Sequence, residues 1–168
     1  LRERLDRDPR CLRVVPLPGW LPGVEPDRAM LDPRHLRGVD VVVHTALLPA
    51  PVGRRAEASA ERAEVDGARQ LLSAAAAAGV PRVVLWSQAL VYGARPDNPN
   101  YLTESHPLRE SAAAFVAARL RLEREAATFA AAHPEVAVVT LRTAALLSPG
   151  VPSYAAALLR LPLCPVLL

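Results

Sequence analysis

Short runs of apolar, often β-branched residues alternate along the chain with longer stretches that have helical periodicity. Apolar runs bounded by polar residues, Gly or Pro are typical of strands that are buried on both faces of a sheet. Runs of this kind predict strands at Leu12–Leu17, Val39–His44, Arg82–Trp86 and Val136–Leu141. The helical patterns predict helices at Leu1–Asp8, Glu57–Ala78, Glu110–Ala132 and Ser153–Leu161.

Gly and Pro residues mark the boundaries of these elements. Gly79, with Pro81 just beyond it, is a strong stop signal for the first long helix, and Pro134 follows the second. Loops are expected at Gly19–Pro26 and Ala94–Pro107, and the pattern of Arg28–Leu36 fits neither element type. Strands that alternate with helices predict right-handed βαβ units, and therefore an α/β fold with a Rossmann-like, doubly wound parallel sheet.

The segment Arg82–Gly93 (RVVLWSQALVYG) carries the first functional indication. Its apolar strand runs directly into Ser87 and Gln88, and ligands of open α/β sheets bind beyond the carboxyl ends of the strands. The segment resembles the strand that carries the active-site Ser or Thr in the extended short-chain dehydrogenases, the NAD-dependent epimerase/dehydratase family. The resemblance implies a nicotinamide dinucleotide as cofactor and a nucleotide sugar as substrate.

Other segments resemble the same family, in the family's order. They are Gly38–Leu47 (GVDVVVHTAL), Glu64–Leu72 (EVDGARQLL), Thr103–Arg109 (TESHPLR) and Leu141–Gly150 (LRTAALLSPG). In the family, the residues after the first of these strands lie against the cofactor, and the last segment closes over the nicotinamide. The resemblance therefore implies cofactor-binding positions, which are Thr45, Ala46, Leu47, Ser87, Arg119 and Thr143.

The resemblance also implies a domain organisation. Residues 1–150 are expected to form a partial NAD(P)-binding Rossmann domain that lacks the family's first strand and its Gly-rich pyrophosphate turn. Residues 151–168 are expected to begin the C-terminal substrate-binding part. The chain starts at Leu1 and its single Met is Met30, which favours a fragment of a longer protein.

The departures from the family pattern fall on its catalytic chemistry. In the family a Ser or Thr polarises the substrate oxygen, a Tyr acts as general acid/base, and a Lys holds the nicotinamide ribose and lowers the pKa of the Tyr. These positions are Gln88, Phe115 and Arg119, and the chain contains no Lys, because all 20 of its basic residues are Arg. Phe115 has no titratable group, and an Arg stays protonated, which makes it a poor proton relay. The pattern predicts a degenerate site with no confident catalytic residue.

The cofactor side departs from the family as well. Pro18 follows the strand that should end in an acidic residue for the adenosine ribose, so the choice between NAD and NADP is left open. Glu64 stands at the position of a family Asn, where its charge is unfavourable near a pyrophosphate. Arg119 has two interpretations, either a grip on ribose or phosphate or an ion pair with Glu123, four residues further on.

Other candidate side chains have a structural interpretation beside the functional one. Ser87 is either a substrate-polarising hydroxyl shifted by one position or a group that satisfies the end of the strand. Tyr92 is either a shifted acid/base or a packed loop residue. His44 either contacts the cofactor or is a hydrogen-bonded structural residue.

The composition of the chain argues against several classes of binding partner. The net charge is +3, but the Arg residues are scattered among Asp and Glu and only 4% of residues are aromatic, so no nucleic-acid partner is expected. Cys11 and Cys164 lie at opposite ends of the chain and match no metal-binding spacing, which favours free thiols in the cytoplasm and no metal. No apolar run is long enough for a membrane helix, so a soluble protein without a membrane partner is expected.

The leading hypothesis is an NAD(P)-binding protein of the epimerase/dehydratase family with a degenerate Ser/Tyr/Lys site. The alternative is a non-catalytic pseudoenzyme that senses a dinucleotide or binds a partner, as a homodimer or as a heterodimer with an active homologue. Ala-rich faces at Ala112–Ala118 and Ala126–Ala132 are compatible with a four-helix dimer interface and equally with packing on the sheet. A decayed gene product without function is a third reading.

Overall fold

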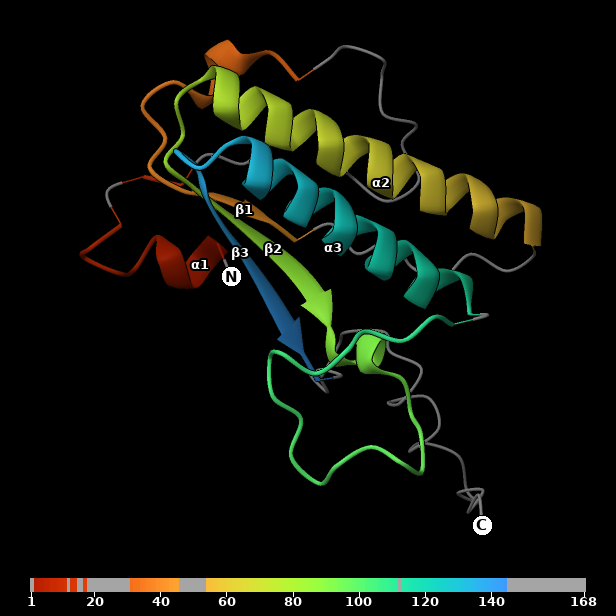
Figure 1. Cartoon of the computed structure of the whole chain (residues 1–168). Helices are drawn as coiled ribbons and strands as arrows, with labels where there is room; N and C mark the ends of the chain where they lie inside the picture. The colour runs from red at the N-terminus through yellow and green to blue at the C-terminus, as the bar shows by residue number, and fades with distance from the viewer. Residues whose placement is uncertain are drawn as a thin grey trace, which may run out of the picture.

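A computed structural model of the chain describes residues 2–11, 13, 14, 17, 31–45, 54–111 and 113–144 (Figure 1). Within these residues a three-stranded parallel sheet has the order β1-β2-β3, with β1 at Val42–His44, β2 at Arg82–Gln88 and β3 at Ala137–Thr143. Helix α2 (Arg54–Ala77) connects β1 to β2, and α3 (Ala114–Ala132) connects β2 to β3. The predicted α/β fold with a parallel sheet is confirmed.

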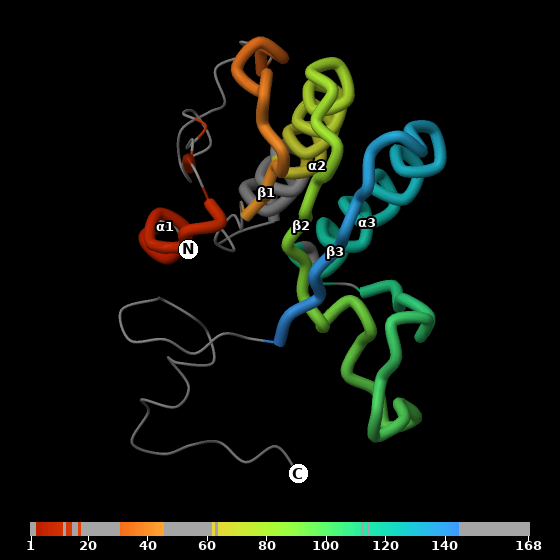
Figure 2. Tube along the Cα trace, turned by 90° about the vertical axis from the view of Figure 1, so that its left-hand side faces the viewer, coloured from red at the N-terminus to blue at the C-terminus, as the bar shows by residue number. Residues whose placement is uncertain are grey.

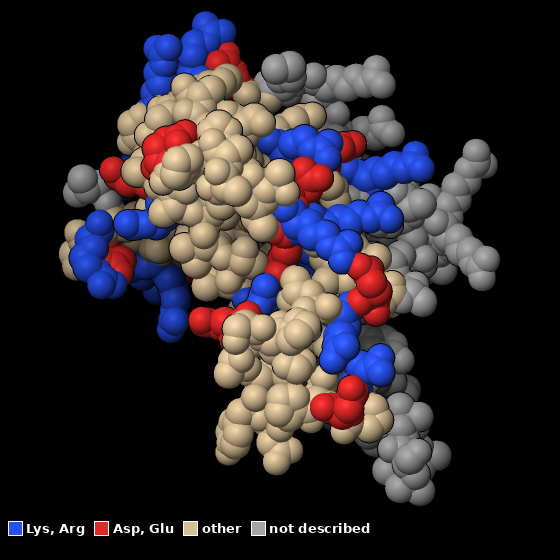
Figure 3. All heavy atoms as spheres, viewed as in Figure 1, with Lys and Arg blue, Asp and Glu red and all other residues tan. Residues whose placement is uncertain are grey.

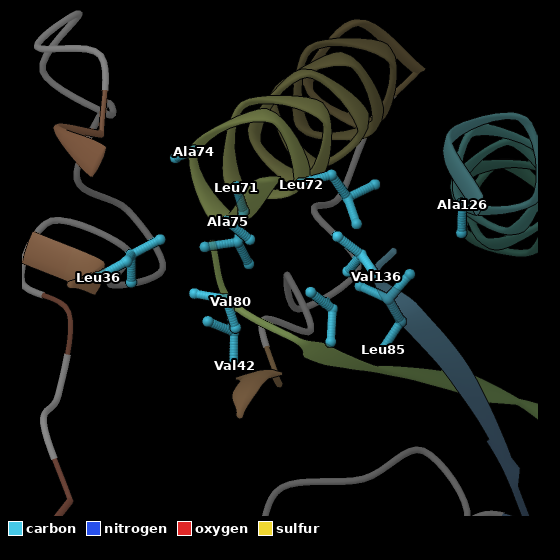
Figure 4. Close-up of a cluster of buried hydrophobic side chains, with 11 residues drawn as sticks. Leu36, Val42, Leu71, Leu72, Ala74, Ala75, Val80, Leu85, Ala126 and Val136 are labelled. Atoms are coloured by element: carbon cyan, nitrogen blue, oxygen red, sulfur yellow. The ribbon is translucent and has the colours of Figure 1, made fainter. Parts of the chain in front are cut away.

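Both long helices lie on the same side of the sheet, and the short helix α1 (Arg2–Leu5) lies on the other side (Figure 2). The core forms between the sheet and the two long helices. Figure 4 shows its close-up, in which Leu72 and Ala75 of α2 and Ala126 of α3 face Leu85 of β2 and Val136. On the opposite face of the sheet, Val41, Val43, Val139 and Leu141 remain 37% to 49% exposed.

The strands place successive side chains on opposite faces, and this alternation decides which residues face the helices. In β2, Val83, Leu85 and Ser87 are buried, whereas the intervening residues are partly exposed. In β3, Val139 and Leu141 are on the exposed face, so that Arg142 lies on the face of the helices. Ser87 therefore continues the core-facing row of its strand.

Most predicted elements are present with shifted ends. The predicted helix at Leu1–Asp8 is α1, and the helix predicted at Glu57–Ala78 begins three residues earlier, at Arg54. The helix predicted at Glu110–Ala132 begins four residues later, at Ala114, because Glu110, Ser111 and Ala113 still lie outside the helix. Strand β2 continues past Trp86 to Gln88, because it pairs along its whole length with β3.

The strand predicted at Leu12–Leu17 is wrong for the residues that the structure describes there. Arg13, Val14 and Leu17 lie outside the sheet. A parallel strand needs a neighbouring edge for its hydrogen bonds, and Pro16, in the middle of this run, has no backbone N–H to donate. The apolar pattern alone therefore does not make a strand here.

Short 3-10 turns complete the described elements. The ambiguous segment Arg28–Leu36 contains η1 (Pro33–Leu36), whose N-cap residue Asp32 accepts a hydrogen bond from the Arg34 amide at 2.9 Å. Segment η2 (Ala89–Tyr92) follows β2 directly and ends at Gly93, whose φ of 75° favours glycine. The expected loop at Ala94–Pro107 is confirmed, whereas the predicted helix at Ser153–Leu161 and the proposed domain part at 151–168 lie outside the described residues.

The core makes a direct prediction about stability. Leu72 is almost fully buried between α2 and the sheet, so Leu72→Ala leaves a cavity and is expected to lower the free energy of unfolding by about 2–5 kcal/mol. Urea unfolding of the full-length protein measures this change. Leu90→Ala is the matched control, because Leu90 is about half exposed and its truncation is expected to cost much less. Equal effects of the two substitutions would contradict the described core.

Candidate functional site

The carboxyl ends of the three strands bring several of the predicted site residues to one edge of the sheet. Thr45 follows β1, Gln88 ends β2 and Thr143 ends β3. Gln88 and Thr143 are direct neighbours in the register of the parallel pair. Ala46 and Leu47, which were predicted with them, lie outside the described residues. This edge is where α/β proteins of this architecture bind ligands.

A buried carboxylate, that of Glu123, binds two side chains on the face of the sheet that is covered by the helices. Glu123 of α3 is 6% exposed and accepts a hydrogen bond from the hydroxyl of Ser87, with Ser87 Oγ 2.5 Å from Glu123 Oε1. Its other oxygen, Oε2, accepts from Arg142 Nε at 2.9 Å and from Arg142 Nη2 at 2.8 Å. The Ser87 side chain is fully buried, and its hydroxyl donates to this carboxylate rather than to the backbone groups that the sequence suggested.

Arg142 also connects the sheet to the loop after β2. Its Nη1 donates to the phenol oxygen of Tyr92 at 2.7 Å and to the backbone carbonyl of Glu104 at 3.1 Å. The carboxylate of Glu123 raises the pKa of Arg142, so the guanidinium stays charged. Tyr92 is buried and held by Arg142, and its ring lies edge-on against His106. It is therefore a packed residue of the loop.

The three residues that the resemblance assigns to the catalytic positions have different surroundings. Gln88 is half-buried at the end of β2. Phe115, in the first turn of α3, is 46% exposed. Arg119, one turn further along α3, is only 4% exposed. Phe115 is thus an apolar ring at the surface, and Arg119 is a buried guanidinium.

Arg119 forms an ion pair with a residue of the neighbouring helix. Its Nη1 donates to Oε1 of Glu64 in α2, and the Glu64 side chain is 5% exposed. Burial lowers the pKa of Arg119, and the Glu64 carboxylate opposes this effect. The predicted ion pair with Glu123 is not the pair that forms, because Glu123 faces Ser87 and Arg142 on the sheet side of α3. Glu64, whose charge was unfavourable for a pyrophosphate, is neutralised by Arg119.

His44 lies at the end of β1 beside this ion pair. It is 4% exposed, and burial together with the charge of Arg119 lowers its pKa to about 4. Its imidazole is therefore neutral at pH 7. His44 is therefore a neutral, buried ring beside a guanidinium.

On the other face of the sheet, Trp86 and Thr143 form a pair that the sequence did not reveal. The indole Nε1 of Trp86 donates to Oγ1 of Thr143 at 2.7 Å. In the register, Trp86 faces Leu141, so this is a diagonal contact between neighbouring strands. The Thr143 hydroxyl lies 3.5 Å from the carbonyl of Ser87, which completes its hydrogen bonding. The period-two pattern of β2 and β3 is the signal by which this pair could have been found.

The surface charge is mixed on the face shown in Figure 3, where Arg side chains lie next to Asp and Glu side chains. Two pairs of this kind are Arg69 with Glu125 and Arg124 with Glu110. Among the described residues, no group of three or more His, Cys, Asp or Glu side chains could hold a metal ion. No helix in the described part of the chain has the length and apolar character needed to cross a membrane.

Known proteins resemble this chain in sequence and in fold. At 29% identity, 99% of the chain aligns with an uncharacterized protein of Mycobacterium tuberculosis, of which the chain spans about half, 49%. The structure is similar to TunA, an NAD-dependent NDP-hexosamine 5,6-dehydratase involved in tunicamycin biosynthesis, with 30% identity and a TM-score of 0.57. That match covers 67% of this chain and 36% of TunA.

A second solved structure is MoeE5 in complex with UDP-glucose and NAD, with 28% identity, a TM-score of 0.55, and coverage of 66% of this chain and 36% of MoeE5. The model of the NAD dependent epimerase/dehydratase family matches residues 28–160, which include all three strands and both long helices. The chain belongs to the NAD-dependent epimerase/dehydratase family.

Proposed function

We propose that this protein binds NAD or NADP at the carboxyl ends of β1, β2 and β3, and that it lacks the proton transfer of its family. The observation that carries the proposal is the pair of positions on α3, where Phe115 has no titratable group and Arg119 is buried against Glu64. The relatives TunA, which is NAD-dependent, and MoeE5, which was solved with NAD, support the choice of ligand.

The described residues fit a ligand that is rich in hydroxyl and amide groups. Thr45 and Gln88 place an exposed hydroxyl and a half-buried carboxamide at the ends of neighbouring strands. A carboxamide both donates and accepts hydrogen bonds. These two residues would hold the dinucleotide, whereas Ser87 and Thr143 would support the strands behind it. A bound nicotinamide would supply hydride transfer, and Thr45 and Gln88 would hold and orient it.

Two similar proteins support a substrate class for this chain. TunA acts on an NDP-hexosamine, and MoeE5 was solved with UDP-glucose. We infer that this protein derives from enzymes acting on nucleotide sugars. Without a placed acid/base, its turnover is expected to be lower than that of an intact enzyme by about 100- to 10,000-fold.

Calorimetric titration of NAD, NADH, NADP and NADPH into the full-length protein tests the proposal. Saturable binding of at least one of them is expected, and Gln88→Ala is expected to weaken it about 2- to 10-fold, because one neutral hydrogen bond is lost. Gln70→Ala is the matched control, since Gln70 is exposed on α2. Binding that Gln88→Ala leaves unchanged would place the ligand elsewhere, and no binding would refute the proposal.

The non-catalytic partner-binding module remains the second candidate, because Phe115 is exposed at the start of α3. An exposed apolar side chain at this position suits a contact with another protein more than it suits proton transfer. Co-purification with an active homologue, abolished by Phe115→Glu, would support this candidate. A strictly monomeric full-length protein would count against it.

A further inference from the structure

Glu64 and Arg119 form a buried ion pair, in which each side chain is only 5% exposed. The other ion pairs described for this structure each have at least one more exposed partner. A buried charge without a partner costs several kcal/mol, so removal of either residue alone is expected to destabilise the protein. The same two helices also form an exposed pair, Arg69 with Glu125, at 55% and 35% exposure. That second pair offers a comparison in the same helix–helix interface.

The position of Arg119 relates this pair to the ligand-binding edge. Val116 and Leu120, which flank Arg119 in α3, pack against Val91 of η2, the turn that directly follows the carboxyl end of β2. Arg119 is therefore a buried cation near the carboxyl ends of the strands. A guanidinium binds carboxylates and phosphates through the same planar set of N–H donors. A ligand oxyanion at Arg119 would therefore compete with the Glu64 carboxylate for the same donors.

We propose that the Arg119 guanidinium is an oxyanion-binding position that the Glu64 carboxylate occupies in the free protein. An incoming dinucleotide then has to displace this carboxylate or share the guanidinium with it. The proposal rests on the proposed function for the identity of the ligand, but the oxyanion position itself does not depend on it. Glu64 is then the residue that limits the affinity of the site, since binding of the ligand competes with an ion pair already present.

Sulfate is a suitable probe, because it is an oxyanion that Arg119 can bind once Glu64 no longer carries a charge. Glu64→Gln keeps the volume and one acceptor oxygen but leaves the guanidinium without a counter-ion. In the full-length protein, sulfate is expected to raise the Tm of Glu64→Gln more than it raises that of the wild type, at equal ionic strength of chloride. The comparison with wild type is essential, because sulfate stabilises proteins generally.

Two further variants make the response specific. Glu125→Gln removes the charge of the exposed pair between the same helices and is expected to respond to sulfate like the wild type. Glu64→Gln with Arg119→Met removes the cation as well and is expected to lose the additional response. If Glu64→Gln does not fold in chloride, the yield of refolding in sulfate against chloride gives the same comparison. An equal sulfate response with and without Arg119 would overturn the proposal.

Dinucleotide titration of the same variants separates this proposal from the proposed function. Glu64→Gln is expected to bind the dinucleotide about tenfold more tightly than the wild type, and Arg119→Met in that background is expected to remove the gain. A sulfate response that depends on Arg119, without binding of any dinucleotide, would uphold the oxyanion position and refute the proposed function. Dinucleotide binding that Glu64→Gln does not tighten, with no added sulfate response, would refute the oxyanion position alone.

Discussion

A fourfold variant is expected to turn over a nucleotide sugar about 100- to 10,000-fold faster than the wild type, which is the usual contribution of a placed acid/base. Its substitutions are Gln88→Ser, Phe115→Tyr, Arg119→Lys and Glu64→Asn. The Phe115 ring is 46% exposed, so a phenol hydroxyl can be added there without burying a polar group. The change at Glu64 is needed because its carboxylate, left in place, would hold the new ammonium group as it now holds Arg119.

The measurement is the rate at which the full-length protein with bound dinucleotide forms epimerised or dehydrated product from a panel of UDP- and dTDP-sugars. The matched control carries the changes at Gln88, Arg119 and Glu64 but keeps Phe115, and it is expected to stay at the rate of the wild type. Turnover by the wild type at the rate of the fourfold variant would show that the site is not degenerate. A control as active as the fourfold variant would remove the role assigned to the phenol.

Arg119→Met is expected to lower the free energy of unfolding by about 3–5 kcal/mol, because it leaves the Glu64 carboxylate buried without its counter-charge. Adding Glu64→Leu is expected to restore most of this loss, since a buried ion pair and two apolar side chains of similar volume are often about equally stable. Urea unfolding of the full-length protein at pH 7 measures both changes.

Arg69→Met serves as the control for this stability prediction. Arg69 pairs with Glu125 between the same two helices, but both side chains are largely exposed, so the expected loss is at most about 1 kcal/mol. If Arg119→Met cost no more than Arg69→Met, the Glu64–Arg119 pair would be solvated in the native protein. That result would also contradict the proposal that Glu64 occupies an oxyanion-binding position at Arg119.

The Glu64–Arg119 pair changes how the departures from the family pattern are interpreted. Along the sequence, the resemblance assigns Glu64 to an Asn position and Arg119 to a Lys position, which are two separate departures. In the structure each neutralises the other in the interior. Either charge alone would be strongly destabilising, so the two substitutions are compatible with a stable fold only together. We infer that this part of the site is adapted rather than decayed.

The fold was predictable because hydrophobic periodicity reports burial directly. Uninterrupted apolar runs indicated β1, β2 and β3, and Gly79 indicated the end of α2, where the chain has a φ of 72°. The start of α3 was missed, since its N-cap Ala113 has no capping side chain and follows other Ala residues of equal helix propensity. The strand predicted at Leu12–Leu17 depended on a neighbouring edge that no local pattern can report.

The amino-acid sequence by itself determined the parallel α/β architecture and the family, because these follow from periodicity and from the order of local motifs. Only the tertiary structure decided the partners of the charged side chains. Glu64 and Arg119 are 55 residues apart, and Glu123 meets Ser87 across 36 residues. Such pairs arise because two helices pack side by side over one sheet, and their interaction depends on distance in space rather than on spacing along the chain.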